Sequence, residues 1–416
     1  MHKKIKISQN YIMNEGYSNT NYRFSSGSGS NVFISGKKYI DLSNAAGSLI
    51  LGHNSKIYKK AIKKSLTKNL SIIAAPNAQA ESYSKLLKQI FPNYSKFIFC
   101  NSGTEAVFKS VRIARAISKK NKIVSVVGSW HGSADSLLYS AGKNLKPFEL
   151  SAGLTKDSKK NIIFIPYNDV NKSKQILDKF KKDISSIIIE PVQGCLPIEK
   201  PEKYLKFLNN YSKKNNIILI FDEMITGLRV KNNSIQNTFR IKPSISTFGK
   251  CFGGGLPIGI IAVSKKIENL IKKKKINIFF GGTFSGNSLA AFVGQETTRF
   301  IIKNKNKIIY DLEKKSQFFQ NDINSFCVKN NINAKVYRFG SLIRIIFSNK
   351  MVKNRIQRDF LEKNNLSGKI KLRNFLFKNK IYYSSNGLIF FSYSTTKYEI
   401  KKVVSTFKLG LKRFIK

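Results

Sequence analysis

The sequence predicts an α/β fold, in which a large domain with a mostly parallel sheet is followed by a smaller α+β domain. Two observations lead to this prediction. Between about residues 96 and 262, short apolar runs rich in β-branched residues alternate with helical stretches, as expected for a parallel sheet buried on both faces. After about residue 308, the pattern changes to a basic helical stretch followed by two further apolar runs. The chain of 416 residues is also longer than one ordinary domain.

The elements divide into three parts. Residues 1–50 are expected to form an N-terminal arm with a small hairpin, because glycines punctuate the apolar runs at 32–34 and 39–40. Residues 51–300 are expected to form the large α/β domain, and residues 301–416 the small C-terminal α+β domain. The predicted strands of the large domain are 97–100, 123–127, 162–165, 187–189, 217–221 and 258–263, and those of the small domain are 342–347 and 388–391.

Composition narrows the class of protein. The 42% of hydrophobic residues suffice for a large core, although 74 Lys plus Arg against 23 Asp plus Glu give a net charge of +51. Lysines occur in almost every segment, and the longest run is only Lys272 to Lys275. We therefore interpret the charge as a solvated surface with no specific nucleic-acid partner, and a basic nucleic-acid-binding protein is the remote alternative.

Several features bear on the compartment. The apolar runs are strand-sized, far below the ~20 residues that cross a bilayer, and polar residues follow the basic N-terminus where a secretory signal would be apolar. The four cysteines are far apart and form no CxxC pair, and the three histidines are scattered. We expect a cytoplasmic protein with reduced thiols, no metal site and no membrane contact.

Two segments follow predicted strands, at the edge where ligands bind in open α/β sheets. Asn101-Ser102-Gly103-Thr104 joins a strand to a predicted helix over 104–117, and its amides and hydroxyls could hold a phosphate. An ordinary helix cap would give the same pattern. Trp130, in a loop of small residues with His131, could stack on a planar ligand or pack in the core.

Two further positions carry chemistry. Asp222 directly follows the apolar run 217–221, and a carboxylate there could pair with a protonated heterocycle nitrogen or form a structural ion pair or cap. Lys250 ends a short apolar segment and precedes the glycines 253–255, which let the backbone approach a ligand. A desolvated lysine amine can form a Schiff base with an aldehyde. In so lysine-rich a chain, this context singles out Lys250.

Taken together, these motifs resemble the class III (fold type I) pyridoxal-phosphate-dependent aminotransferases, and among them the glutamate-1-semialdehyde 2,1-aminomutases. The resemblance extends from Gly27 into the C-terminal domain. Its matching segments are 47–53, 101–106, 130–135, 190–194, 222–230, 249–250, 253–259 and 282–287.

The resemblance implies pyridoxal 5'-phosphate as cofactor, with Lys250 as the Schiff-base lysine and Asp222 as the partner of the pyridine nitrogen. It also implies a homodimer with shared active sites, because Thr283 would reach the phosphate bound in the neighbouring subunit. The other binding residues that it implies are Ser102, Gly103 and Thr104 for the phosphate, Trp130 and Met224 for the two ring faces, and Arg23 for the substrate carboxylate.

The chain departs from the aminomutase pattern at two places. Ala46 stands where the aminomutases have a pocket tryptophan, and the segment 382–388 lacks their C-terminal glutamate. We therefore expect an aminotransferase that moves an amino group from an amino donor to a separate carbonyl acceptor. The alternative is a glutamate-1-semialdehyde 2,1-aminomutase, which moves the amine within one substrate.

Overall fold

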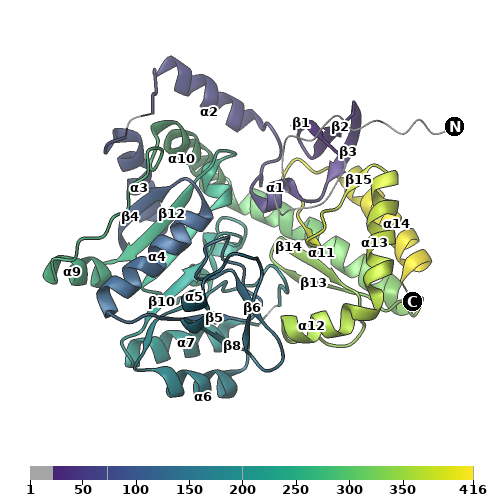
Figure 1. Cartoon of the computed structure of the whole chain (residues 1–416). Coiled ribbons are helices and arrows are strands. Elements are labelled where there is room, and N and C mark those ends of the chain that lie inside the picture. Colours follow the sequence, from purple (N-terminus) through teal and green to yellow (C-terminus); the bar gives the residue numbers. More distant parts are fainter. Residues whose placement is uncertain (1–21, 73, 199, 416) are drawn as a thin grey trace.

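The computed structural model describes residues 22–72, 74–198 and 200–415, so the first 21 residues of the predicted arm lie outside the described residues (Figure 1). The large domain is built on a sheet with the strand order β4-β12-β11-β10-β9-β5-β8. Its strands are β4 (Tyr94–Cys100), β5 (Lys122–Val126), β8 (Ile162–Ile165), β9 (Ile184–Ile189), β10 (Ile218–Asp222), β11 (Ile245–Gly249) and β12 (Gly259–Ser264).

The predicted mostly parallel sheet is confirmed. Strands β8, β5, β9, β10 and β11 pair in parallel, whereas β12 runs antiparallel to both β11 and β4. Alternate residues of the central strands enter different cores. Ile188 and Ile220 pack beneath helix α4 (Gly103–Ser118), and Ile187 and Leu219 pack against helices α6 (Val170–Phe180) and α7 (Glu202–Lys214). The sheet is therefore buried on both faces, as its continuous apolar runs indicate.

Helices surround the sheet in Figure 1. The helices of this domain are α2 (Lys56–Thr67), α3 (Ala78–Ile90), α4 (Gly103–Ser118), α5 (Lys156–Lys160), α6 (Val170–Phe180), α7 (Glu202–Lys214), α8 (Ile235–Thr238), α9 (Lys265–Lys273) and α10 (Ser288–Lys303). The short elements are the turn helix α1 (Asn44–Gly47), the hairpin β6 (Tyr139–Ala141) and β7 (Pro147–Glu149), and the 3₁₀ turns η1 (Lys231–Asn233) and η2 (Lys250–Gly253).

The C-terminal part has its own sheet, ordered β13-β14-β16. The predicted strand 388–391 is only two residues long in the structure, because the chain leaves the sheet after Ile389 and Phe390 N donates to Leu42 O at 2.8 Å. The elements are α11 (Lys305–Lys329), β13 (Lys335–Phe339), β14 (Leu342–Ile346), α12 (Arg355–Glu362), η3 (Lys363–Asn365), α13 (Leu366–Lys378), β15 (Ile381–Tyr382), β16 (Leu388–Ile389) and α14 (Lys397–Phe414).

The predicted N-terminal hairpin packs on this C-terminal part. Strands β1 (Phe24–Ser28), β2 (Asn31–Ile34) and β3 (Lys37–Asp41) form a sheet that β15 extends, in parallel with β3. Ile40 and Leu42 enter the same hydrophobic core as Phe319 of α11. In Figure 1 this hairpin lies next to β15 and helices α13 and α14. The domain boundaries at residues 50 and 300 stay predictions.

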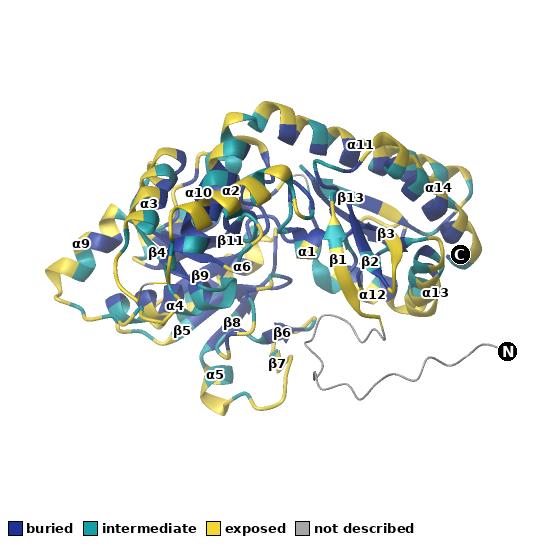
Figure 2. Ribbon diagram, turned by 90° about the horizontal axis from the view of Figure 1, so that it is seen from above, coloured by how far each residue is buried: buried dark blue, intermediate teal, exposed yellow. Residues whose placement is uncertain are grey.

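Buried residues concentrate in the strands, and exposed residues line the outer faces of helices such as α11 and α14 (Figure 2). Some lysines on the helices pair with carboxylates one helical turn away, as Lys174 does with Asp178. Such exposed pairs contribute little to stability. Within the described ranges, no helix is long and apolar enough to cross a membrane.

Candidate active site

Asp222 is held rigidly at the carboxyl end of β10. Its side chain is 1% exposed, and Oδ2 lies 2.8 Å from His131 Nδ1. Oδ1 accepts hydrogen bonds from Met224 N at 3.1 Å and from Thr247 Oγ1 at 3.2 Å. A buried carboxylate fixed from three sides can present its charge to one further partner without rearranging.

The adjacent Glu223 has a different role. Its two carboxylate oxygens accept hydrogen bonds at 2.9 Å from the backbone N–H groups of Ile235 and Gln236, at the start of α8. Burial raises the pKa of Glu223 to about 7. Of the two neighbouring acids, Glu223 therefore caps α8 with both of its oxygens, whereas Asp222 does not cap this helix.

Met224 connects Asp222 with the two other predicted site segments. Its Sδ would lie 3.0 Å from a Cβ placed on Gly103 and 2.7 Å from a Cβ placed on Gly249, the residue before Lys250. Glycine at both positions therefore lets the methionine side chain reach the N-terminus of α4 and the end of β11. The structure thus brings Gly103, Asp222, Met224 and Lys250 into one neighbourhood.

The predicted phosphate turn caps α4. Ser102 is the N-cap residue, and its Oγ accepts a hydrogen bond from Glu105 N at 3.1 Å, so α4 begins one residue before the predicted Thr104. Thr104 Oγ1 accepts a hydrogen bond from Ser133 N at 3.2 Å. Both hydroxyl groups can still donate, and the first N–H groups of a helix attract anions. The cap and the phosphate site are therefore compatible.

Trp130 does not pack in the core, since 54% of its surface is exposed. His131, the next residue, is buried, and its Nε2 has no hydrogen-bond partner within the described part of the chain. Sequence reasoning does not identify His131 as a site residue. Its position in the Trp-His-Gly loop is the available signal, but a lone histidine is more often structural.

A strained turn lies beside Lys250. Residues Asn44 to Gly47 have positive φ angles of 45°, 53°, 53° and 86°, a conformation that costs a non-glycine residue roughly 1 kcal/mol or more. The turn is held by Gly47 O, which accepts from Arg229 Nε at 2.8 Å and from Cys251 Sγ at 3.3 Å. The backbone next to Ala46 is thus tied to the residue that follows Lys250.

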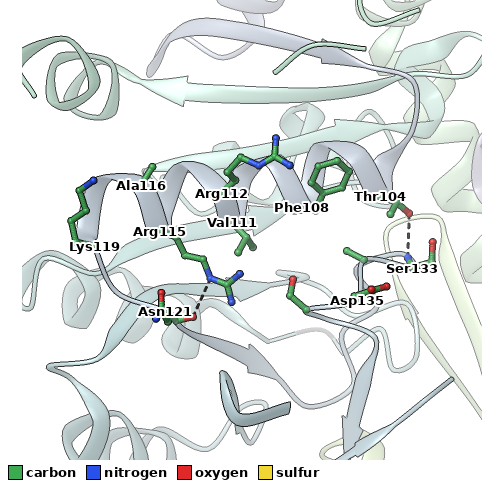
Figure 3. A pocket seen from close by; sticks show the side chains of 12 residues that line it. Thr104, Phe108, Val111, Arg112, Arg115, Ala116, Lys119, Asn121, Ser133 and Asp135 are labelled. Atoms are coloured by element: carbon green, nitrogen blue, oxygen red, sulfur yellow. Dashed lines mark hydrogen bonds between the residues drawn. The ribbon is translucent and has the colours of Figure 1, made fainter. Parts of the chain in front are cut away.

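A cavity of about 770 Å³ runs along α4 and starts at Thr104 and Ser133 (Figure 3). Phe108 and Val111 contribute apolar walls, and Figure 3 shows Arg115 pointing toward Asn121, whose backbone oxygen accepts from Arg115 Nε. The charged residues of the lining are Arg112, Arg115, Lys119 and Asp135. Three cations against one carboxylate make this lining favourable to anionic ligands, and it does not include Asp222, Met224 or Lys250.

Two predicted residues lie on other elements. Thr283 is exposed in the loop between α9 and α10, where Phe279 and Phe284 are also 75% and 55% exposed. Arg23 directly precedes β1, and the adjacent Tyr22 stacks on Phe377 of the C-terminal part with ring centroids 3.9 Å apart. The roles of both residues stay predictions.

Comparisons with known proteins identify the family. The family described as "Aminotransferase class-III" matches residues 12–373. A glutamate-1-semialdehyde 2,1-aminomutase from Thermodesulfovibrio yellowstonii is 36% identical over 78% of this chain and 76% of its own length. A protein of the same name from Thermosipho melanesiensis is 34% identical over 89% of this chain and 87% of its own.

Solved structures share the fold. An omega-transaminase from Sphaerobacter thermophilus has a TM-score of 0.85 and 21% identity, covering 95% of this chain and 92% of its own. A glutamate-1-semialdehyde aminomutase from Pseudomonas aeruginosa, solved as a lysine-to-alanine variant in complex with PMP, has a TM-score of 0.84 and 17% identity, covering 96% and 89%. The fold is therefore that of the fold type I transaminases, and this chain belongs to the class III aminotransferases, which are pyridoxal-phosphate-dependent enzymes.

Proposed function

We propose that this chain binds pyridoxal 5'-phosphate and transfers an amino group from an amino donor to a separate carbonyl acceptor. The residues fit this cofactor. Ser102, Gly103 and Thr104 would hold the phosphate at the N-terminus of α4, and the buried Asp222 would face the ring nitrogen. Lys250 would hold the aldehyde carbon, while Met224 and Trp130 would contact the two faces of the ring.

When bound, this cofactor supplies an aldehyde that takes up the amino group and a protonated ring that accepts an electron pair. Asp222 would keep the proton on the ring nitrogen, because its negative charge is fixed and shielded from water. Lys250 Nζ, once the amino substrate has taken its place, would carry the proton that leaves the substrate carbon. His131 would hold Asp222 in position through the 2.8 Å contact.

The turn at 384–388 is the reason that we prefer an aminotransferase with two separate substrates to an aminomutase. Asn386 closes this turn, since its Oδ1 accepts from Ser384 Oγ at 2.6 Å and from Leu388 N at 3.0 Å. Asn386 O accepts from Arg344 Nη1 at 2.7 Å. The segment 384–388 thus contains an amide and no acidic residue, and the cation that contacts it comes from β14. An intermediate would have no carboxylate here to retain it until the second half of an intramolecular transfer.

Substrate tests decide between transferase and mutase. We expect glutamate-1-semialdehyde alone to yield little 5-aminolevulinate, and an amino acid plus a carbonyl acceptor to support repeated turnover. The absorbance of the cofactor in the purified holoenzyme would report each half-reaction. Efficient isomerisation without an acceptor would overturn the preference.

The aminomutase reaction is the second candidate. It is favoured by the names of the relatives, which are 36% and 34% identical to this chain over most of its length. Against it stands Ala46, in the strained turn beside Cys251, where the resemblance places a tryptophan. The same substrate test separates the two candidates.

We infer that the active unit is a homodimer in which Thr283 of one chain reaches the phosphate of the other. The support is an exposed threonine between the exposed side chains of Phe279 and Phe284. Neither a Lys250→Ala nor a Thr283→Ala homodimer would have an intact site. Mixed dimers of the two variants should recover up to half of the wild-type activity per mixed dimer, because one of their two sites has both residues. No recovery in verified mixed dimers would argue against sharing.

A further inference from the structure

Glu190 is a buried carboxylate that the proposed chemistry does not use. It directly follows β9 and is 6% exposed. Its Oε2 accepts a hydrogen bond from Trp130 N at 2.8 Å, and its own N–H donates to Ser129 Oγ at 3.3 Å. The loop after β9 is therefore hydrogen-bonded to the loop after β5 at two consecutive residues, Ser129 and Trp130.

Gln193 strengthens the same attachment. Its Nε2 donates to Val127 O at 3.0 Å and to Ser129 Oγ at 3.1 Å, and its side chain is fully buried. Gly128 has a φ of 99°, and a Cβ placed there would lie only 2.5 Å from Gln193 Oε1. Glutamate and glutamine from one loop thus fix the backbone of the other over residues 127–130.

This attachment fixes the backbone that carries the Trp130 ring. More than half of the Trp130 surface is exposed, so packing alone does not immobilise the ring. The next residue, His131, reaches Asp222 through its Nδ1. A change in the backbone at Trp130 would therefore be transmitted to both the exposed ring and the His131–Asp222 contact.

We propose that Glu190 is a positioning residue, whose side-chain oxygen anchors Trp130 N so that the tryptophan ring faces the cofactor and His131 stays against Asp222. The inference rests on the proposed cofactor role of Trp130. In this role Glu190 accepts a hydrogen bond, and its charge is not required. A neutral residue with a carbonyl oxygen in the same place should therefore position Trp130 equally well.

The electrostatics of Glu190 agree with this assignment. Burial, and next the negative charge of Asp222, raise the pKa of Glu190 to about 7, while His131, Trp130 N and Lys250 act in the opposite direction. A raised pKa means that the folded protein favours the uncharged carboxyl group at this position. Glu190→Gln should fold at least as well as the wild type at neutral pH and above.

The experiment uses the fact that Trp130 is the only tryptophan of the chain. Its emission and its quenching by acrylamide report on this loop directly, with or without cofactor. Glu190→Gln, which keeps an acceptor, should match the wild type. Glu190→Leu, which keeps volume but removes the acceptor, should increase the quenching constant about twofold and weaken pyridoxal phosphate binding about tenfold, a loss comparable to that of a hydrogen bond to a buried group.

Controls make the result specific. Glu362→Leu removes another buried glutamate that accepts a backbone N–H, that of Phe347 at 3.0 Å in the C-terminal part, and should leave Trp130 emission unchanged. Circular dichroism checks that each variant folds. If Glu190→Leu does not fold, Glu190→Asp, which withdraws the oxygen by one methylene, should still raise quenching relative to Glu190→Gln.

Each outcome decides the proposal. Wild-type quenching and cofactor affinity in folded Glu190→Leu or Glu190→Asp would overturn it, and so would a Glu190→Gln variant as impaired as Glu190→Leu. Borohydride labelling of Lys250 by pyridoxal phosphate in the wild type tests the proposed function separately. Its absence would refute that function, whereas quenching of the cofactor-free protein would still test whether Glu190 positions Trp130.

Discussion

Replacement of Lys250 by alanine is expected to abolish amino transfer, with turnover at least ~10⁴-fold below that of the wild type. The variant loses both the group that would hold the cofactor covalently and the base that would carry the proton, and each function typically contributes several orders of magnitude. Turnover of the best donor and acceptor pair, measured after loading both proteins with pyridoxal phosphate, gives the ratio.

The matched control is Lys266→Ala, which removes an exposed lysine of α9 and should leave turnover unchanged. Borohydride treatment of the wild type should fix one pyridoxyl group per chain, and peptide mapping should place it on Lys250. A stoichiometric label on any other lysine would contradict the assignment, which matters in a chain with 74 Lys plus Arg.

The fold can be predicted from the sequence where burial leaves a continuous apolar run, as in β8 and β10. Strand β11 is not among the predicted strands, because Ser246 and Thr247 interrupt its apolar pattern. Both residues are nevertheless fully buried. The Ser246 hydroxyl forms a hydrogen bond with Tyr94 OH at 2.5 Å, and the Thr247 hydroxyl donates to Asp222. Such pairings depend on residues far away in the sequence and leave no local signal.

The direction of β12 is likewise hidden from the sequence. A parallel and an antiparallel strand buried on both faces have the same apolar composition, so the run 258–263 identifies a strand without its orientation. The attachment of the N-terminal hairpin to β15 is hidden for a similar reason. It pairs Ile40 with Ile381, and a two-residue strand has no recognisable pattern.

The candidate site is predictable in its parts because its residues stand at strand ends and helix starts. Asp222 ends β10, Lys250 follows β11 and Ser102 caps α4. The partners of these residues are harder to predict. His131 and Asp222 are 91 residues apart in the sequence, and Glu190 contacts a different loop, that of Trp130. The resemblance marks these motifs, and only the structure says what each one touches.

Asp222→Asn is expected to keep the fold and the cofactor but to lower turnover by roughly 10²–10³-fold, the usual effect of removing one preorganised electrostatic partner. The asparagine Oδ1 can still accept from Met224 N and Thr247 Oγ1, and His131 Nδ1, which already faces this side chain, can accept from the new amide in the tautomer that carries its proton on Nε2. What the variant loses is the negative charge that would keep the ring nitrogen protonated. Borohydride labelling of Lys250 and an unchanged melting temperature would show an intact site, so near-normal turnover in that variant would refute the role of Asp222.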